Sequence, residues 1–296
     1  MPSIQAKITR KFLQLQTFGW AKGSIAQQRA RQEKNAGIFK IPAGITVEKK
    51  SLDGIPAELI NVENPGNGII LYLHGGAYAV GSVNVHREYL SRLAKACQVK
   101  VLAIDYRLAP EYPFPAALED SLTAYHWLIA QGYDPASIVL AGDSAGGGLA
   151  IAAMVSLRDD HKPLPACAVC VSPWLNLCRT GSKVNNNHDP ILNPEILSLY
   201  SHYYAGQTDP GNPLISPIYA DLRGLPPIFI QAGTNEILLD QIEEFCEKAR
   251  MANIEIVFDL YQGLFHVFQI IPILPESTRS LEEIAKFIGK KINRDM

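Results

Sequence analysis

The stretch SIVLAGDSAGGGLAIAAMVSL, residues 137–157, decides how this chain folds. It opens with a short apolar run and closes with an alanine-rich run at helical spacing, so a buried strand leads into a helix. Between them stands GDSAG at 142–146, a G-x-S-x-G pattern. A serine on so sharp a strand-to-helix turn needs glycine two positions to either side, because side chains there would collide. The pattern therefore predicts that Ser144 is a nucleophile at the end of a sheet.

The rest of the chain extends this unit into an α/β fold. From about residue 46 onward, short β-branched runs alternate with longer helical patterns. This alternation predicts a doubly wound, mostly parallel sheet with helices on both faces. We expect strands at 69–73, 101–105, 138–141, 168–172, 228–232 and 255–260. We expect helices at about 86–97, 115–130, 145–158, 239–252 and 276–290.

Two segments interrupt the alternation. Residues 1–45 carry Ile4, Ile8, Phe12 and Leu15 at spacings of three and four, which predicts an amphipathic helix. Its simplest interpretation is packing on the core, and docking on a membrane surface is the alternative. Residues 176–220 separate two strands by more than a normal connection. We therefore expect one domain, 1–296, in which a helical cap formed by 1–45 and 176–220 covers a core formed by 46–175 and 221–296.

Composition limits the partners. With 27 basic and 29 acidic residues, the chain has no basic excess to attract nucleic acid. The first twenty residues contain neither a signal-peptide run nor a membrane span, so we expect a cytoplasmic protein without stable membrane insertion. Five cysteines, most of them inside apolar runs, favour buried thiols over a disulfide framework.

A second glycine-rich loop follows the expected strand at 69–73. It reads His74-Gly75-Gly76-Ala77, and paired glycines allow the main chain to approach a reacting carbonyl closely. We expect the backbone N–H groups of Gly75 and Gly76 to form an oxyanion hole. The third donor should be the N–H of Ala145, because the residue after the nucleophile supplies one in this geometry.

Three motifs together resemble one known family. HGGAYAVGS at 74–82, DYRLAPEYPFPAALED at 105–120 and GDSAGGGLA at 142–150 are similar to motifs of the hormone-sensitive-lipase family of esterases, bacterial family IV. The likeness spans roughly residues 46–290. It implies an α/β-hydrolase fold, a triad of Ser, His and Asp or Glu, an HGG-type oxyanion hole, a cap, no metal, and short acyl esters as substrates. Here HGGA stands where HGGG is usual, so the loop departs from the family at its fourth position.

The general base is expected after the nucleophile in the chain. Among the histidines beyond Ser144, only His266 lies in a loop that follows a strand, IEIVFDLY, near the C-terminus. The acid should lie between the nucleophile and the histidine in the chain, and the family resemblance implies an Asp or Glu early in the loop after the strand at 228–232. Glu236 lies there, whereas Asp240 comes one helical turn later. We therefore expect Glu236 to be the acid and keep Asp240 as the alternative.

These residues predict a serine carboxylesterase. We expect Ser144 to form an acyl-enzyme on short- to medium-chain acyl esters, lactones included, with no cofactor. An amidase or peptidase could use the same triad, and a non-catalytic hydrolase-fold receptor would need a triad member to be missing. The partner is thus a small ester, and family resemblance also allows a homodimer through a sheet edge.

Overall fold

One sheet runs through the whole molecule. The computed structural model describes residues 1–20, 23–179 and 189–292. Within these residues the strands are β1 (Ile45–Leu52), β2 (Ile55–Val62), β3 (Ile69–Leu73), β4 (Lys100–Ile104), β5 (Ile138–Asp143), β6 (Cys167–Val171), β7 (Ile228–Asn235) and β8 (Ile256–Phe265). They pair in the order β1-β2-β4-β3-β5-β6-β7-β8.

The sheet is mostly parallel. All pairs from β4 through β8 run parallel, whereas β1 pairs with β2 and β2 pairs with β4 in the antiparallel sense. This confirms the predicted fold class. The sequence expectations missed the hairpin of β1 and β2, which extends one edge of the sheet.

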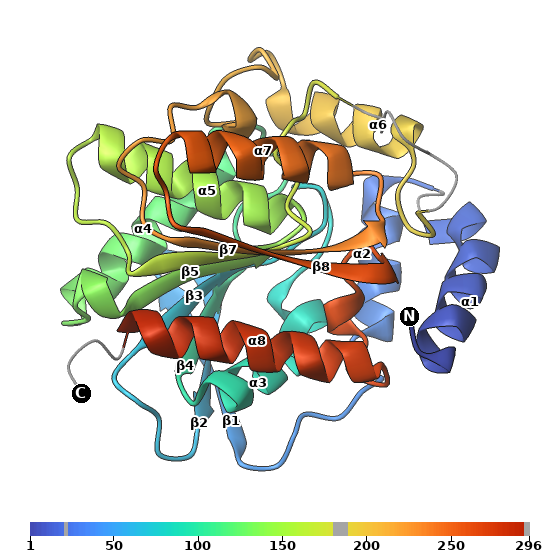
Figure 1. The fold of residues 1–296 in the computed structure, drawn as a ribbon, viewed down its shortest axis with the longest axis horizontal. Helices are drawn as coiled ribbons and strands as arrows, with labels where there is room; N and C mark the ends of the chain where they lie inside the picture. The colour runs from blue at the N-terminus through green and yellow to red at the C-terminus, as the bar shows by residue number, and fades with distance from the viewer. Residues whose placement is uncertain (21–22, 180–188, 293–296) are drawn as a thin grey trace.

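Helices surround this sheet. They are α1 (Ile4–Trp20), α2 (Ile25–Asn35), α3 (Val83–Cys97), α4 (Ala116–Ala130), α5 (Ala145–Asp159), α6 (Pro194–Ala205), α7 (Leu239–Met251) and α8 (Pro275–Ile292), with short 3-10 turns η1 (Pro135–Ser137), η2 (Pro217–Tyr219) and η3 (Phe268–Ile270). Figure 1 shows α5 and α7 on one face and α3 and α8 on the other. No helix in the described ranges combines the length and apolarity needed to cross a bilayer.

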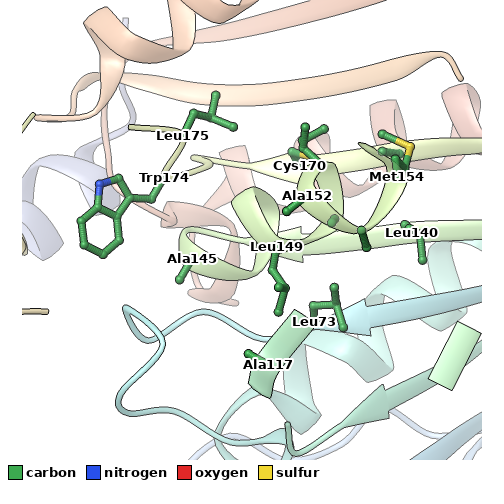
Figure 2. Close-up of a cluster of buried hydrophobic side chains, with 14 of the residues drawn as sticks. Leu73, Ala117, Leu140, Ala145, Leu149, Ala152, Met154, Cys170, Trp174 and Leu175 are labelled. Carbon is green, nitrogen blue, oxygen red and sulfur yellow. The ribbon is translucent and has the colours of Figure 1, made fainter. Parts of the chain in front are cut away.

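The larger part of the core lies on the α5 face. Helix α5 is rich in glycine and alanine, so its backbone can approach the sheet closely. Figure 2 shows Leu149 and Ala152 of α5 among Leu73, Leu140 and Cys170 of the strands. A second cluster of buried side chains fills the space between the sheet and helices α3 and α8. The two clusters hold the strand ends, and therefore the loops beyond them, in fixed positions.

Helices α1, α2 and α6 lie at one end of the sheet. Figure 1 shows them on the side to which the arrowhead of β8 points. They belong to the segments 1–45 and 176–220 that we expected to form a cap. Residues 180–188 of the second segment lie outside the described residues. That these helices form a cap over the core stays a prediction.

The N-terminal helix differs from the expectation in its orientation. We expected its apolar positions Ile4, Ile8, Phe12 and Leu15 to pack on the core, but all four side chains are exposed. Instead Ala6 is buried and faces the body of the protein. The predicted packing of that stripe is therefore wrong, because a periodic pattern identifies an apolar face without saying what lies against it.

Candidate active site

Ser144 lies on a strained turn between β5 and α5. Its φ of 52° and ψ of −119° lie in a region that residues with a side chain rarely adopt. A Cβ on Gly142 would lie 2.4 Å from the carbonyl of Gly146, and one on Gly146 would lie 1.9 Å from the carbonyl oxygen of Leu73. These contacts explain in this chain why both flanking positions are glycine.

The three predicted triad residues lie together. The hydroxyl of Ser144 donates to Nε2 of His266 at 3.0 Å, and Nδ1 of His266 donates to Oε2 of Glu236 at 3.4 Å. We place the hydrogen on Nδ1 because its partner is a carboxylate, which can only accept. Nε2 is then the acceptor of the serine hydroxyl. All three side chains are buried. The serine comes from the β5–α5 turn, the glutamate from the loop after β7, and the histidine from the loop after β8.

Ser172 joins the loops that carry Glu236 and His266. Its hydroxyl donates to Oε1 of Glu236 at 2.7 Å and accepts the N–H of Val267 at 3.2 Å. The N–H of Gly233 also donates to Oε1 at 2.5 Å. One carboxylate oxygen of Glu236 therefore accepts from Ser172 and Gly233, and the other accepts from the imidazole of His266. These contacts fix the orientation of the carboxylate.

Asp189 is a carboxylate near the site that sequence reasoning missed. Its Oδ2 accepts the N–H of Ile237 at 3.0 Å, and its Oδ1 accepts those of Ile191 and Leu192. It thus holds the residue that follows Glu236. The signal that could have found it is the pair Asp189-Pro190 within the long connection 176–220, because Asp-Pro is typical of a turn.

These carboxylates change the pKa of His266. Burial lowers this pKa, but the hydrogen bond and charge of Glu236, together with the charge of Asp189, outweigh burial and raise it above the ordinary 6.5. Asp240, the alternative acid, lies in the first turn of α7 and is not among the carboxylates that act most strongly on His266. The geometry therefore groups Glu236, and not Asp240, with the imidazole.

Asp143 holds the glycine-rich loop after β3. Its Oδ1 accepts the N–H of Gly75 at 2.8 Å and the hydroxyl of Tyr72 at 2.7 Å, while Nε2 of His86 donates to Oδ2 at 3.3 Å. Burial raises the pKa of Asp143, but the charge of His86 and these hydrogen bonds bring it down to about 2. For His86, burial lowers the pKa, and Asp143 raises it above 6.5. The two form a buried ion pair beneath the loop.

The oxyanion loop differs from the expectation at Gly75. Because its N–H already donates to Asp143, Gly75 has no backbone donor left for a substrate. Among the described residues, no acceptor is found for the N–H groups of Gly76 and Ala77. Both residues have positive φ, 126° and 52°. Ala145 opens α5, where the first N–H has no partner inside the helix.

A cavity of about 840 Å³ opens onto these groups. Ser144, His266, Gly76 and Ala77 contribute to its wall. The rest is largely apolar and comes from α2 and the loop before β1, from α3 and the loop before it, from the start of α6 and the segment before it, and from η3, with Leu13 as the contribution of α1. Such a space suits a small molecule with an apolar part.

Comparisons with known proteins agree with this fold. A family model described as the alpha/beta hydrolase fold matches residues 70–270. The crystal structure of an esterase from the bacterial hormone-sensitive lipase family matches with a TM-score of 0.94 and 39% identity, covering 99% of this chain and 100% of that one. The chain belongs to the bacterial hormone-sensitive lipase family of α/β hydrolases.

Curated relatives of this family member are ester hydrolases. An acetyl-hydrolase of Streptomyces hygroscopicus is 38% identical over 295 residues, covering 97% of each chain. An esterase of Acinetobacter venetianus is 38% identical over 254 residues, covering 84% of each chain. The predicted family and class of enzyme are confirmed: the chain is a carboxylic ester hydrolase.

Replacing Gly146 by alanine tests the turn at Ser144. A methyl group 1.9 Å from the Leu73 oxygen must displace backbone, so we expect G146A to lose about 1–3 kcal/mol of unfolding free energy. Because a small misplacement of Ser144 also costs rate, kcat should fall about a hundredfold. Urea denaturation and ester hydrolysis measure both.

The matched control is Gly66→Ala, where a methyl group would meet its nearest neighbour at an ordinary 3.5 Å. We expect this variant to resemble the wild type in both assays. Wild-type stability and rate in G146A would contradict the steric explanation.

Proposed function

We propose that this ester hydrolase works through an acyl-enzyme on Ser144, with His266 as general base and Glu236 as the acid behind it. The observation that carries the proposal is the continuous chain from the Ser144 hydroxyl to His266 at 3.0 Å and on to Glu236 at 3.4 Å. A hydroxyl is a weak nucleophile unless a base removes its proton during attack. The accepting Nε2 of a neutral imidazole supplies that base.

In the first step Ser144 Oγ attacks the ester carbonyl, and its proton passes to Nε2 of His266. The C–O bond to the alcohol then breaks, and the imidazolium returns the proton to the leaving oxygen. In the second step water attacks the acyl carbon and gives a proton to His266. The bond to Ser144 Oγ breaks, this oxygen regains the proton, and the carboxylic acid departs.

Glu236 supports both steps through the imidazole. Its carboxylate keeps hydrogen on Nδ1, which leaves Nε2 as the acceptor, and it stabilises the imidazolium formed during each transfer. Ser172 and Gly233 hold this carboxylate in place through its other oxygen. Asp189 adds a second negative charge near the imidazole.

We assign the oxyanion hole to the backbone N–H groups of Gly76, Ala77 and Ala145. The two loop N–H groups have no acceptor among the described residues, and that of Ala145 opens a helix whose N-terminal end favours negative charge. Each such donor typically contributes about 2.7–4 kcal/mol to the lowering of the barrier. Asp143 contributes indirectly, because it takes up the N–H of Gly75 and thereby positions the loop.

We propose short- to medium-chain acyl esters, lactones included, as substrates. The cavity of about 840 Å³ accommodates a small ester with an apolar acyl chain. One relative is named an acetyl-hydrolase, which supports the short end of this range. Helices α1, α2 and α6, with the segments next to them, contribute to the cavity wall and would act as the cap.

An acyl-length series tests this function. Hydrolysis of p-nitrophenyl acetate, butyrate, octanoate and laurate should be fastest among the shorter esters, and Ser144→Ala should abolish all of it. Peptide p-nitroanilides serve as the comparison, because an amidase would cleave them at similar rates. Absence of ester turnover by the wild type, or full turnover by S144A, would overturn the proposal.

The acid is tested by a pair of conservative variants. Glu236→Gln keeps the size of the side chain but removes its charge, so kcat should fall by about 10³ to 10⁴. Asp240→Asn is the matched control on α7 and should leave kcat close to that of the wild type. If kcat falls in D240N and not in E236Q, Asp240 is the acid.

The pH profile follows from the pKa of His266. Protonated His266 cannot accept the serine proton, so kcat/KM should fall as the pH drops through a pKa that lies above 6.5. The carboxylate of Glu236 raises this pKa, and therefore the residual activity of E236Q should show its acid limb at lower pH. An acid limb at or below 6.5 in the wild type contradicts the proposed base environment.

A further inference from the structure

The inner face of α1 is fixed against the body of the protein. The N–H and hydroxyl of Ser3 donate to the carboxylate of Glu276 at 2.6 and 2.9 Å. Ala6 is buried in a cluster with Leu264 and Phe268, and Leu13 packs against the same cluster. These contacts fix which side of the helix faces the protein.

The opposite side of α1 is an exposed apolar face, made of Ile4, Ile8, Phe12 and Leu15. The exposed fractions of these side chains are 73%, 64%, 56% and 82%. At 100° per residue the four positions fall within one narrow stripe, roughly opposite the buried Ala6. Nothing within the described residues covers this face, and Figure 1 shows α1 at the margin of the molecule.

Positive charge accompanies the α1 apolar face. Lys7 and Lys11 are exposed and lie beside the stripe at helical spacing. Residues 1–45 contain eight Lys or Arg residues and one acidic residue, Glu33, although the whole chain has 27 basic and 29 acidic residues. The N-terminal segment is therefore basic, and the rest of the chain carries an excess of acidic residues.

The same helix contributes one side chain to the wall of the active-site cavity. Leu13, on the inner side of α1, is part of the cavity wall. Ile38, Phe39 and Ile41 also belong to this wall and are exposed at its outer rim. A surface bound by α1 would thus lie close to the cavity in which an acyl ester reaches Ser144.

We propose that α1 docks this esterase reversibly on an anionic phospholipid surface. The apolar face would enter the boundary between headgroups and acyl chains, while Lys7 and Lys11 would contact the phosphates. Docking would give the cavity access to esters that partition into lipid. The docking itself involves no bond breaking, and it does not depend on the acyl-enzyme proposed above.

Charge favours lipid over the other occupants of such a face. A second copy of the chain would bring two basic segments together, and their like charges would repel. A nucleic acid would satisfy the positive charge but would leave the four apolar side chains without a partner. An anionic lipid surface satisfies both features of α1.

Sedimentation with vesicles tests the proposal. The full chain as Ser144→Ala, which is expected not to hydrolyse lipid, should sediment with phosphatidylglycerol vesicles and remain in solution with phosphatidylcholine vesicles. The double variant I8S/F12S should lose about tenfold or more in partition coefficient, because two apolar groups no longer enter the lipid. Met251→Ser is the matched control, because Met251 is 76% exposed on α7. This variant should have the partition coefficient of the Ser144→Ala protein.

Charge is tested separately. Each of Lys7→Gln and Lys11→Gln should weaken binding about fivefold, and added salt should weaken that of the wild type. Lys162→Gln, an exposed lysine beyond the end of α5, is the control and should bind as the wild type does. Hydrolysis of p-nitrophenyl acetate by the α1 variants, built with Ser144 intact, should stay at the wild-type rate, which verifies folding and separates this test from that of the function.

Three outcomes overturn the proposal. The first is failure of the protein to sediment with phosphatidylglycerol vesicles. The second is equal binding by I8S/F12S and the Met251 control. The third is a dimer in solution that I8S/F12S converts to a monomer, since the α1 apolar face would then be an interface between copies.

Discussion

The turn at Ser144 is the constraint on which the rest of the structure depends. It requires β5 to end and α5 to begin within one residue, with the Leu73 oxygen of β3 so close that only glycine fits at position 146. Because β3 and β5 are hydrogen-bonded neighbours, this contact also brings the loop after β3 beside the serine. Ser144 and the N–H groups of Gly76 and Ala77, for which no acceptor is found among the described residues, therefore meet as a result of strand order.

Two buried imidazole–carboxylate pairs organise the site on either side of Ser144. Glu236 pairs with His266, and Asp143 pairs with His86. In both pairs the carboxylate raises the pKa of the imidazole despite burial. One pair touches the serine hydroxyl directly, whereas the other holds the backbone of the neighbouring loop. The same kind of pair thus orients an imidazole beside Ser144 in one place and fixes the backbone of Gly75 in the other.

Periodicity and spacing predicted the parallel strands, the serine turn and the grouping of His266 with Glu236, because these features are local or follow chain order. They missed the hairpin of β1 and β2, in which β1 has only one buried side chain and forms no apolar run. They assigned Gly75 as a donor, because only the folded chain brings the Asp143 carboxylate to its N–H. They turned the apolar stripe of α1 inward for the same reason, since its surroundings are set by tertiary contacts.

The site draws its parts from two separate sources. The side chains of Ser144, Glu236 and His266 come from loops at the ends of β5, β7 and β8, whereas much of the cavity wall comes from α2 and the loop after it, from α3, and from the segment around the start of α6. Selectivity and chemistry are therefore encoded in different stretches of the polypeptide. Substitutions or insertions in the wall can change which esters enter while Ser144, Glu236 and His266 keep their positions, which makes this scaffold adaptable to new acyl groups.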